Sequence, residues 1–171
     1  MKRAGVRTLI VLGAVLVLLV AATQAGAAKK PLVVTLAHGP VTAANSVYVD
    51  TAPPGPSVGD VRSFYLPLTK PGGSAQIGYL AGTLTTLWLD KPSPGMELRT
   101  SNLIFTVGAA ANQIVLGGIG PYSQTAPTVA AKSTLVRPVL GGSGKYAGAR
   151  GWCLSTHFAD NTWTHTFHLT F

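Results

Sequence analysis

The histidines near the C-terminal end are the side chains in this sequence best suited to acid–base chemistry. His165 lies between Trp163 and Phe167 in a segment where apolar and polar residues alternate, so these three should share the more apolar face of a strand. An imidazole there could act as an acid, a base or a hydrogen-bond donor near neutral pH. The alternative is a structural histidine with satisfied hydrogen bonds, at a barrel end or in a subunit interface.

A metal centre is not expected from these residues. His157, Asp160, His165 and His168 are close in sequence, but His165 and His168 point to opposite faces of one strand. Cys153 is the single cysteine, so neither an intramolecular disulfide nor a zinc site built on paired cysteines can form. We predict no metal and no cofactor, and we expect Cys153 to be a small buried hydrophobe.

Two familiar hydrolytic arrangements are also excluded. Ser155, His157 and Asp160 lie too close along one strand and its turn to converge as a triad, and no nucleophile elbow is present. The sequence contains five carboxylate side chains, and none is paired closely with another along the chain. This argues against a glycosidase that uses two carboxylates.

The glycine-rich segment RPVLGGSGKYAGARG, residues 137–151, raises the question of phosphate binding. A Walker-type loop needs Gly-Lys-Ser/Thr leading into a helix, whereas here Lys145 is followed by Tyr146 and the segment lies between predicted strands. A dinucleotide fingerprint needs a βαβ unit, and the sequence predicts none. We therefore predict a structural turn, in which glycines permit positive φ and close approach of strands.

The elements that must position these side chains are strands. Short runs rich in Val, Thr, Leu and aromatic residues are separated by Gly/Pro clusters, a pattern typical of an all-β sandwich or barrel. Asp160–Asn161 is expected to form a tight hairpin. The predicted strands cover residues 32–37, 46–50, 59–66, 75–88, 97–107, 113–118, 133–139, 150–159 and 162–171.

The N-terminal residues have the features of a secretory signal peptide. A basic start, Lys2 to Arg7, precedes an apolar run over residues 8–20, and Ala25-Gly26-Ala27 is a small-x-small cleavage site. We assign residues 1–27 to this signal and expect a secreted, extracellular protein without stable membrane insertion after cleavage. The alternative is an uncleaved N-terminal anchor.

The charge that remains after cleavage is modest. Removing three basic residues leaves ten basic against five acidic residues, a net charge of +5 in place of +8. The remaining cations are scattered, whereas a nucleic-acid-binding protein usually clusters them on one face or stripe. We therefore expect no nucleic-acid partner.

Several blocks of the sequence resemble two related plant families. RPVLGGSGKYAGARG resembles the GGTG-aromatic…ARG signature of dirigent proteins and the GG-x-G…G-x-x-G stretch of allene oxide cyclases. VGDVRSF resembles the cyclase Gly-Asp strand, PLTKPGGSAQIGYLAG the dirigent Pro-Leu-Thr block, and QIVLGGIGPY the cyclase strand that ends in Gly-Pro-Tyr. The blocks occur in the same order and span about Val58 to Phe171.

The resemblance implies the fold shared by the two families. This is an eight-stranded antiparallel up-and-down barrel, usually a homotrimer, whose apolar lumen binds a reactive small molecule. The barrel domain would then cover residues 58–171. Residues 28–57 would supply N-terminal strands and a Pro/Gly-rich linker.

The resemblance also indicates lumen residues. Tyr122 corresponds to the tyrosine of the cyclase Gly-Pro-Tyr, and Phe64 to a phenylalanine of the Gly-Asp block. The cyclase asparagine and cysteine fall on Leu66 and Leu84, and the dirigent acidic pair is replaced by Tyr65 and Leu66. The sequence thus resembles the scaffold without either known catalytic set.

Strand alternation extends the predicted lumen. If Phe64 faces inward, Arg62 and Asp60 should do so too and could form an ion pair at the barrel mouth; if Leu84 faces inward, so should Trp88. The predicted site comprises Tyr122 and His165 as catalytic residues, and Arg62, Phe64, Leu66, Leu84, Trp88 and Arg150 as ligand contacts.

The resulting hypothesis is a secreted, cofactor-independent barrel that binds an apolar or phenolic reactive guest. It would steer coupling or cyclisation by orientation and water exclusion, as a dirigent-type guide. One alternative is an isomerase, an intramolecular cyclase with a different catalytic set. A second is a structural or surface-interaction protein with a packed, ligand-free lumen, which the leucines at positions 66 and 84 favour.

Overall fold

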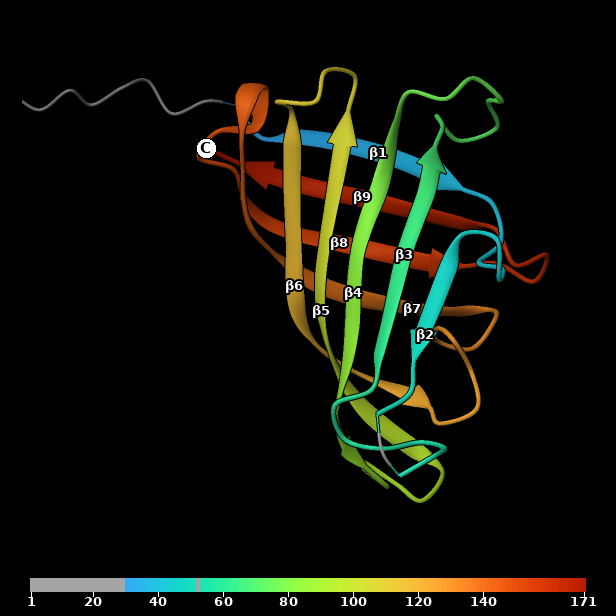
Figure 1. The fold of residues 1–171 in the computed structure, drawn as a ribbon. Coiled ribbons are helices and arrows are strands. Elements are labelled where there is room, and N and C mark those ends of the chain that lie inside the picture. The colour runs from blue at the N-terminus through green and yellow to red at the C-terminus, as the bar shows by residue number, and fades with distance from the viewer. Residues whose placement is uncertain (1–29, 52) are drawn as a thin grey trace, which may run out of the picture.

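The structure is a computed structural model that describes residues 30–51 and 53–171, so the predicted signal peptide lies outside the described residues. All nine predicted strands are present and belong to one antiparallel sheet (Figure 1). The elements are β1 (Leu32–His38), β2 (Ser46–Val49), β3 (Val61–Leu68), β4 (Gly78–Leu89), β5 (Met96–Val107), β6 (Gln113–Ser123), β7 (Ser133–Gly142), the 3-10 helix η1 (Gly144–Tyr146), β8 (Arg150–His157) and β9 (Trp163–Thr170).

The sheet curls until β1 meets the end of β3. Its strand order is β1-β9-β8-β7-β6-β5-β4-β3-β2, and Figure 1 shows β1, β9, β8 and β7 crossing behind β3 to β6. Ala37 of β1 and Thr69, just after β3, exchange two backbone hydrogen bonds of 2.8 and 2.9 Å. This narrow bridge closes β1 and β3–β9 into the predicted eight-stranded barrel, and β2 is an additional strand paired with residues 61–64 of β3.

The C-terminal end of β6 lies beyond the predicted one because strand pairing overrides local composition. β6 continues through the Gly-Pro-Tyr segment to Ser123, which pairs with Met96 of β5. Its ladder with β7 ends at Leu116, so the missing N–H of Pro121 interrupts no strand pairing.

In the described part of the chain, no helix is both long and apolar enough to span a membrane.

The glycine-rich segment is a structural turn, as predicted. It connects β7 to β8 through η1, with Gly144 and Gly148 at φ values of +57° and +81°. A Cβ on Gly151 would lie 2.0 Å from the carbonyl oxygen of His168 on β9. Only glycine allows the two strands to approach so closely, which explains this position without any ligand.

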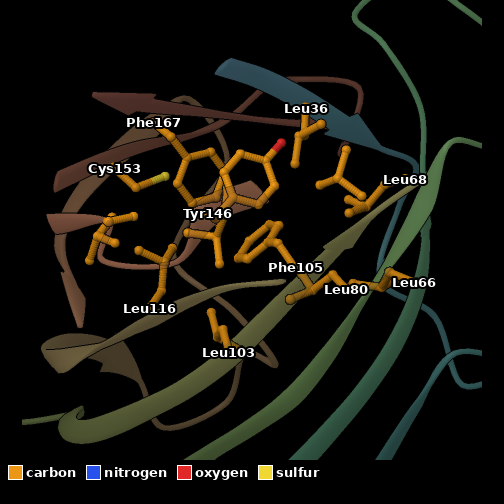
Figure 2. Packing of buried hydrophobic residues seen from close by; sticks show 14 of the residues in the cluster. Leu36, Leu66, Leu68, Leu80, Leu103, Phe105, Leu116, Tyr146, Cys153 and Phe167 are labelled. Atoms are coloured by element: carbon orange, nitrogen blue, oxygen red, sulfur yellow. The ribbon is translucent and has the colours of Figure 1, made fainter. Parts of the chain in front are cut away.

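One half of the barrel interior is packed with apolar side chains (Figure 2). Phe105 and Phe167 meet edge to face with ring centroids 4.9 Å apart, and Leu116 and Tyr146 lie in the same buried cluster. Cys153 is fully buried, and this burial raises the pKa of its thiol to about 12. The expectation of a buried structural cysteine is confirmed.

Candidate functional site

The other half of the barrel interior contains a cavity of about 40 Å³. It lies where β1 ends and β9 begins, at the right-hand end of the barrel in Figure 1. Phe105 of the packed core meets the ring of the cavity residue His165 edge to face, with centroids 4.9 Å apart. The lining residues are His38, Val41, Phe64, Leu66, Leu80, Leu84, Leu103, Tyr122, Thr128, Arg137, Trp163 and His165.

Five of the eight predicted site residues line this cavity: Phe64, Leu66, Leu84, Tyr122 and His165. All five are buried, which confirms their predicted position in the lumen. They come from β3, β4, β6 and β9, so the closed sheet brings together side chains that are distant in sequence. Their roles in binding or catalysis remain predictions.

The predicted lumen position of Trp88 is wrong. The register of β4 against β5 shifts between Thr86 and Trp88, which forms a bulge. A bulge adds one residue to a strand, so the inward–outward alternation reverses beyond it. Trp88 is consequently 61% exposed on the outside of the barrel.

Neither predicted arginine contact lies in the cavity wall. The guanidinium group of Arg62 stacks on the Tyr48 ring, with its carbon atom 4.2 Å from the ring centre, beside a separate small pocket. Arg150 is exposed, and its Nη1 donates a hydrogen bond to the carbonyl of Ala149. Both residues lie at strand positions close to the barrel ends, where a long side chain can leave the lumen for the surface.

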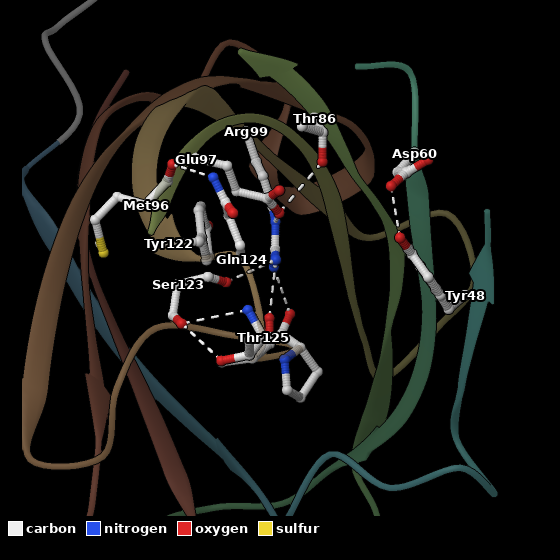
Figure 3. A network of polar contacts seen from close by, with 12 residues as sticks. Tyr48, Asp60, Thr86, Met96, Glu97, Arg99, Tyr122, Ser123, Gln124 and Thr125 are labelled. Atoms are coloured by element: carbon white, nitrogen blue, oxygen red, sulfur yellow. Dashed lines mark hydrogen bonds and ion pairs between the residues drawn. The ribbon is translucent and has the colours of Figure 1, made fainter. Parts of the chain in front are cut away.

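Asp60 does not form the expected ion pair with Arg62. Its carboxylate accepts hydrogen bonds from Tyr48 Oη at 2.5 Å, from the Thr51 backbone N–H at 2.9 Å and from Ser57 (Figure 3). Burial opposes ionisation, but these hydrogen bonds outweigh it and hold the pKa of Asp60 well below its usual range. Asp60 therefore fastens the segment between β2 and β3.

Arg137 is a cavity residue that the sequence reasoning missed. It lies on β7, is 5% exposed, and donates hydrogen bonds to three hydroxyl groups. Nε lies 3.1 Å from Ser101 Oγ, one terminal nitrogen lies 3.5 Å from Ser155 Oγ, and the other contacts Tyr122 Oη. A signal was available in the sequence, because Arg137 lies between the apolar residues Val136 and Val139 of a strand.

Ser155 connects Arg137 to His165. Arginine can only donate, so Ser155 Oγ accepts from Arg137, and its own hydrogen is available to His165 Nδ1, which lies 2.9 Å away. With Ser155 as the donor, the ring proton of His165 lies on Nε2. That nitrogen is buried and has no hydrogen-bond partner in the described residues.

Two buried histidines beside the cavity are held neutral. Burial, the neighbouring imidazole of His38 and the Arg137 cation lower the pKa of His165 well below its usual value. Burial likewise lowers the pKa of His38 to about 4, although the hydrogen bond to the Gly39 carbonyl opposes the shift. The two rings stack with centroids 5.1 Å apart.

Trp163 and the histidines around it form the wall nearest the mouth. The Trp163 indole stacks on His157 with centroids 4.2 Å apart and lies 5.9 Å from the His38 ring. His165 points inward, whereas His168 stacks on Trp152 outside the barrel, which confirms that these two histidines face opposite ways. In residues 30–51 and 53–171 no three metal-ligating side chains converge.

A second buried arginine holds the loop that follows β6. Arg99 is paired with Glu97, and its terminal nitrogens donate to the carbonyls of Pro127 at 2.9 Å and Ala126 at 2.8 Å (Figure 3). Its guanidinium also lies 4.7 Å from the centre of the Tyr122 ring. The loop thereby fixed places Thr128 in the cavity wall.

A larger pocket adjoins the cavity at the barrel mouth. Its volume is about 470 Å³, and it shares Val41, Thr128 and Trp163 with the cavity wall. Most of its other lining residues are alanines and prolines, so its wall is largely apolar. An elongated guest could place one end in the cavity and its body in this pocket.

No protein-family model matches the chain, and no curated protein matches it. Solved structures do match in fold. A pyocyanin demethylase has a TM-score of 0.63 at 21% identity over 81% of this chain and 100% of its own. The pterocarpan synthase dirigent protein GePTS1 gives 0.59 at 17%, over 82% and 88%. The Diels–Alderase AbmU from Streptomyces koyangensis gives 0.54 at 20%, over 85% and 69%.

The chain has the dirigent-type barrel fold. The predicted resemblance is thereby confirmed for the fold. Within this dirigent-type barrel, the side chains of Ser101, Tyr122, Arg137, Ser155 and His165 come from five consecutive strands, β5 to β9. They form a polar row across the inner face, opposite the leucines of β3 and β4.

Proposed function

We propose that this chain is a secreted, cofactor-independent barrel that binds an apolar or phenolic small molecule in its lumen and steers its coupling or cyclisation. The observation that carries the proposal is the cavity with an apolar wall into which Tyr122, Arg137 and His165 converge. Ligand sites typically combine such a wall with a few placed polar groups. Among structures of this fold are a dirigent pterocarpan synthase and a Diels–Alderase.

Steering in such a site depends on orientation. Phe64 and the leucines of β3 and β4 would hold the flat or unsaturated part of the guest, while Tyr122 and His165 would each offer a hydrogen bond. Holding two reacting carbons close together and away from water lowers the entropic part of the barrier without a nucleophile. Neutral His165 suits this role better than a charged group, because it does not attract water into the lumen.

The isomerase alternative has one observation in its favour. His38 Nδ1 lies 2.6 Å from the carbonyl of Gly39 and must donate to it, so Nε2 of this neutral ring carries a lone pair. His165 Nε2 carries a hydrogen on the adjacent ring. An acceptor and a donor side by side could move a proton within one bound molecule.

The small cavity volume favours the packed-lumen alternative. About 40 Å³ admits a few water molecules, so a guest must also occupy the adjoining pocket or displace a lining side chain. Binding therefore requires the barrel mouth to accommodate the body of the guest. A barrel that binds nothing under any condition would be a structural protein.

Assembly into a homotrimer is part of the proposal. Ile119, Val136, Leu140 and Trp152 are exposed on β6, β7 and β8, which are neighbours in the sheet. Apolar side chains gathered on adjacent strands are typical of a subunit interface. Homotrimer formation would cover this face and leave the barrel mouth open to the guest.

Native mass spectrometry of the gently purified protein tests these points together, because it reports the oligomer mass and any retained molecule. A trimer with a bound apolar compound is the expected result. Leu84→Trp, which fills the cavity, should abolish binding of a panel of phenols and oxidised fatty acids. Leu87→Trp on the outside of the same strand is the matched control and should leave binding unchanged. Failure of every compound to bind the unmodified chain would refute ligand steering.

A further inference from the structure

Within residues 30–51 and 53–171, Arg137 has no acidic partner, although it is buried in the cavity wall. Its three contacts are the neutral hydroxyls of Ser101, Ser155 and Tyr122. In the described residues the single ion pair joins Arg99 to Glu97. A guanidinium stays protonated in proteins, so burying it without a counter-charge is unfavourable, and proteins seldom retain such a group without a use for it.

Arg99 provides an internal comparison. It is as deeply buried as Arg137, but it has the Glu97 carboxylate and three backbone carbonyls as acceptors. All three of its guanidinium nitrogens donate to acceptors of the chain itself, which accounts for its burial as a structural feature. The environment of Arg137 lacks the negative charge that the environment of Arg99 contains.

The remaining polar groups of the row also present hydrogens to the cavity. Tyr122 Oη accepts from Arg137, so its own hydrogen is free to donate to a guest. His165 is 3% exposed and lines the cavity, and in the described residues its Nε2 has no partner; with Ser155 donating to Nδ1, this Nε2 carries the ring proton. The polar row thus offers one cation and two neutral donors, and a guest that complements it supplies oxygen acceptors and negative charge.

We propose that the cavity recognises its guest by an anionic oxygen, with Arg137 and Tyr122 as the direct contacts and His165 Nε2 as a further donor. The guest is then an unsaturated or aromatic compound bearing a carboxylate or an equivalent oxyanion. Its apolar body lies against Leu84 and toward Trp163 at the mouth. This inference rests on the proposed function and names the chemical class of the guest.

A pair of isosteric probes tests the charge requirement. Trans-cinnamate and trans-cinnamamide have nearly the same shape, but only the first carries an anionic oxygen at pH 7.5. Isothermal titration calorimetry with the full chain should show cinnamate binding about tenfold or more tightly, as expected for a charge-assisted hydrogen bond. Arg137→Met should remove this preference while cinnamamide affinity changes little, and Arg137→Lys should keep part of it. Arg150→Met, which removes an exposed guanidinium, is the control and should keep all of it.

Each outcome decides between the proposals. Equal affinity of the unmodified chain for the two probes overturns oxyanion recognition, and this comparison stands even if an Arg137 variant does not fold. A preference for cinnamate that persists in Arg137→Met also overturns oxyanion recognition by Arg137, since another group would then bind the anionic oxygen. In both cases the proposed function still holds if the unmodified chain binds a neutral probe and the Leu84→Trp substitution abolishes that binding. Failure of both probes and of all neutral phenols to bind removes the proposed function and this inference together.

Discussion

The buried neutral histidines predict an acid-sensitive fold. His38 has an ordinary pKa of 6.5 in the unfolded chain and a pKa of about 4 in the folded protein, because burial disfavours the charged ring. Between these two values the unfolded chain binds a proton that the folded protein does not. The free energy of unfolding therefore falls as the pH decreases through this interval, and it is unaffected by His38 above about pH 7.

The size of the effect follows from the shift. One pKa unit corresponds to about 1.4 kcal/mol, so His38 should lower the free energy of unfolding by about 2 to 3 kcal/mol between pH 7.5 and 4.5. His165, whose pKa is also lowered by burial, should add to this loss. Guanidinium denaturation followed by tryptophan fluorescence at several pH values measures the change directly.

Two variants distinguish the contribution of His38 to the pH dependence of stability from other effects of acid. His38→Asn keeps a donor for the Gly39 carbonyl but cannot titrate, so it should reduce the pH dependence by roughly half. His168→Asn, which removes a histidine that stacks on Trp152 outside the barrel, keeps His38 and should therefore keep the pH dependence that His38 provides. A free energy of unfolding that stays constant from pH 7.5 to 4.5, or a His38→Asn variant with the original slope, would refute the reasoning.

Three further predictions concern stability and reactivity. Asp60→Asn should lower the free energy of unfolding by about 2 kcal/mol, because the buried carboxylate accepts several hydrogen bonds; denaturation curves measure this. Gly151→Ala should prevent folding, since its Cβ would lie 2.0 Å from a carbonyl oxygen, whereas Gly148→Ala should fold with a loss of about 1 kcal/mol; soluble yield and melting curves distinguish them. Cys153 should react with a thiol reagent only after unfolding, so fast labelling of the native protein would contradict its burial.

Local patterns were sufficient to predict the strands and much of the lumen. Alternation with period two places Phe64 and Leu66 on one face of β3 and His165 on the inner face of β9, and both placements are confirmed. Gly/Pro clusters marked the turns, because these residues supply backbone conformations that others avoid. The same reasoning failed for Trp88, since a bulge arises from pairing between two strands and leaves no signal in either one.

The polar row could not be predicted from the sequence. Arg137 and Tyr122 contact each other only because β6 and β7 curve side by side into the barrel wall, and Ser155 reaches His165 because β8 and β9 are paired in register. Composition shows how many acids and bases the chain has, but whether a buried cation such as Arg137 meets an acidic side chain depends on which strands face one another.

Glu97 and Arg99 alternate onto the same face of β5, so their ion pair is local, whereas hydroxyl and amide donors from β2 and the segment after it surround Asp60. Arg137 is left facing the cavity with neutral neighbours. The sequence alone therefore predicts a barrel with an apolar lumen, because side-chain alternation is a local property. The positive charge inside that lumen is a property of the tertiary structure, because it depends on which charges the fold keeps apart.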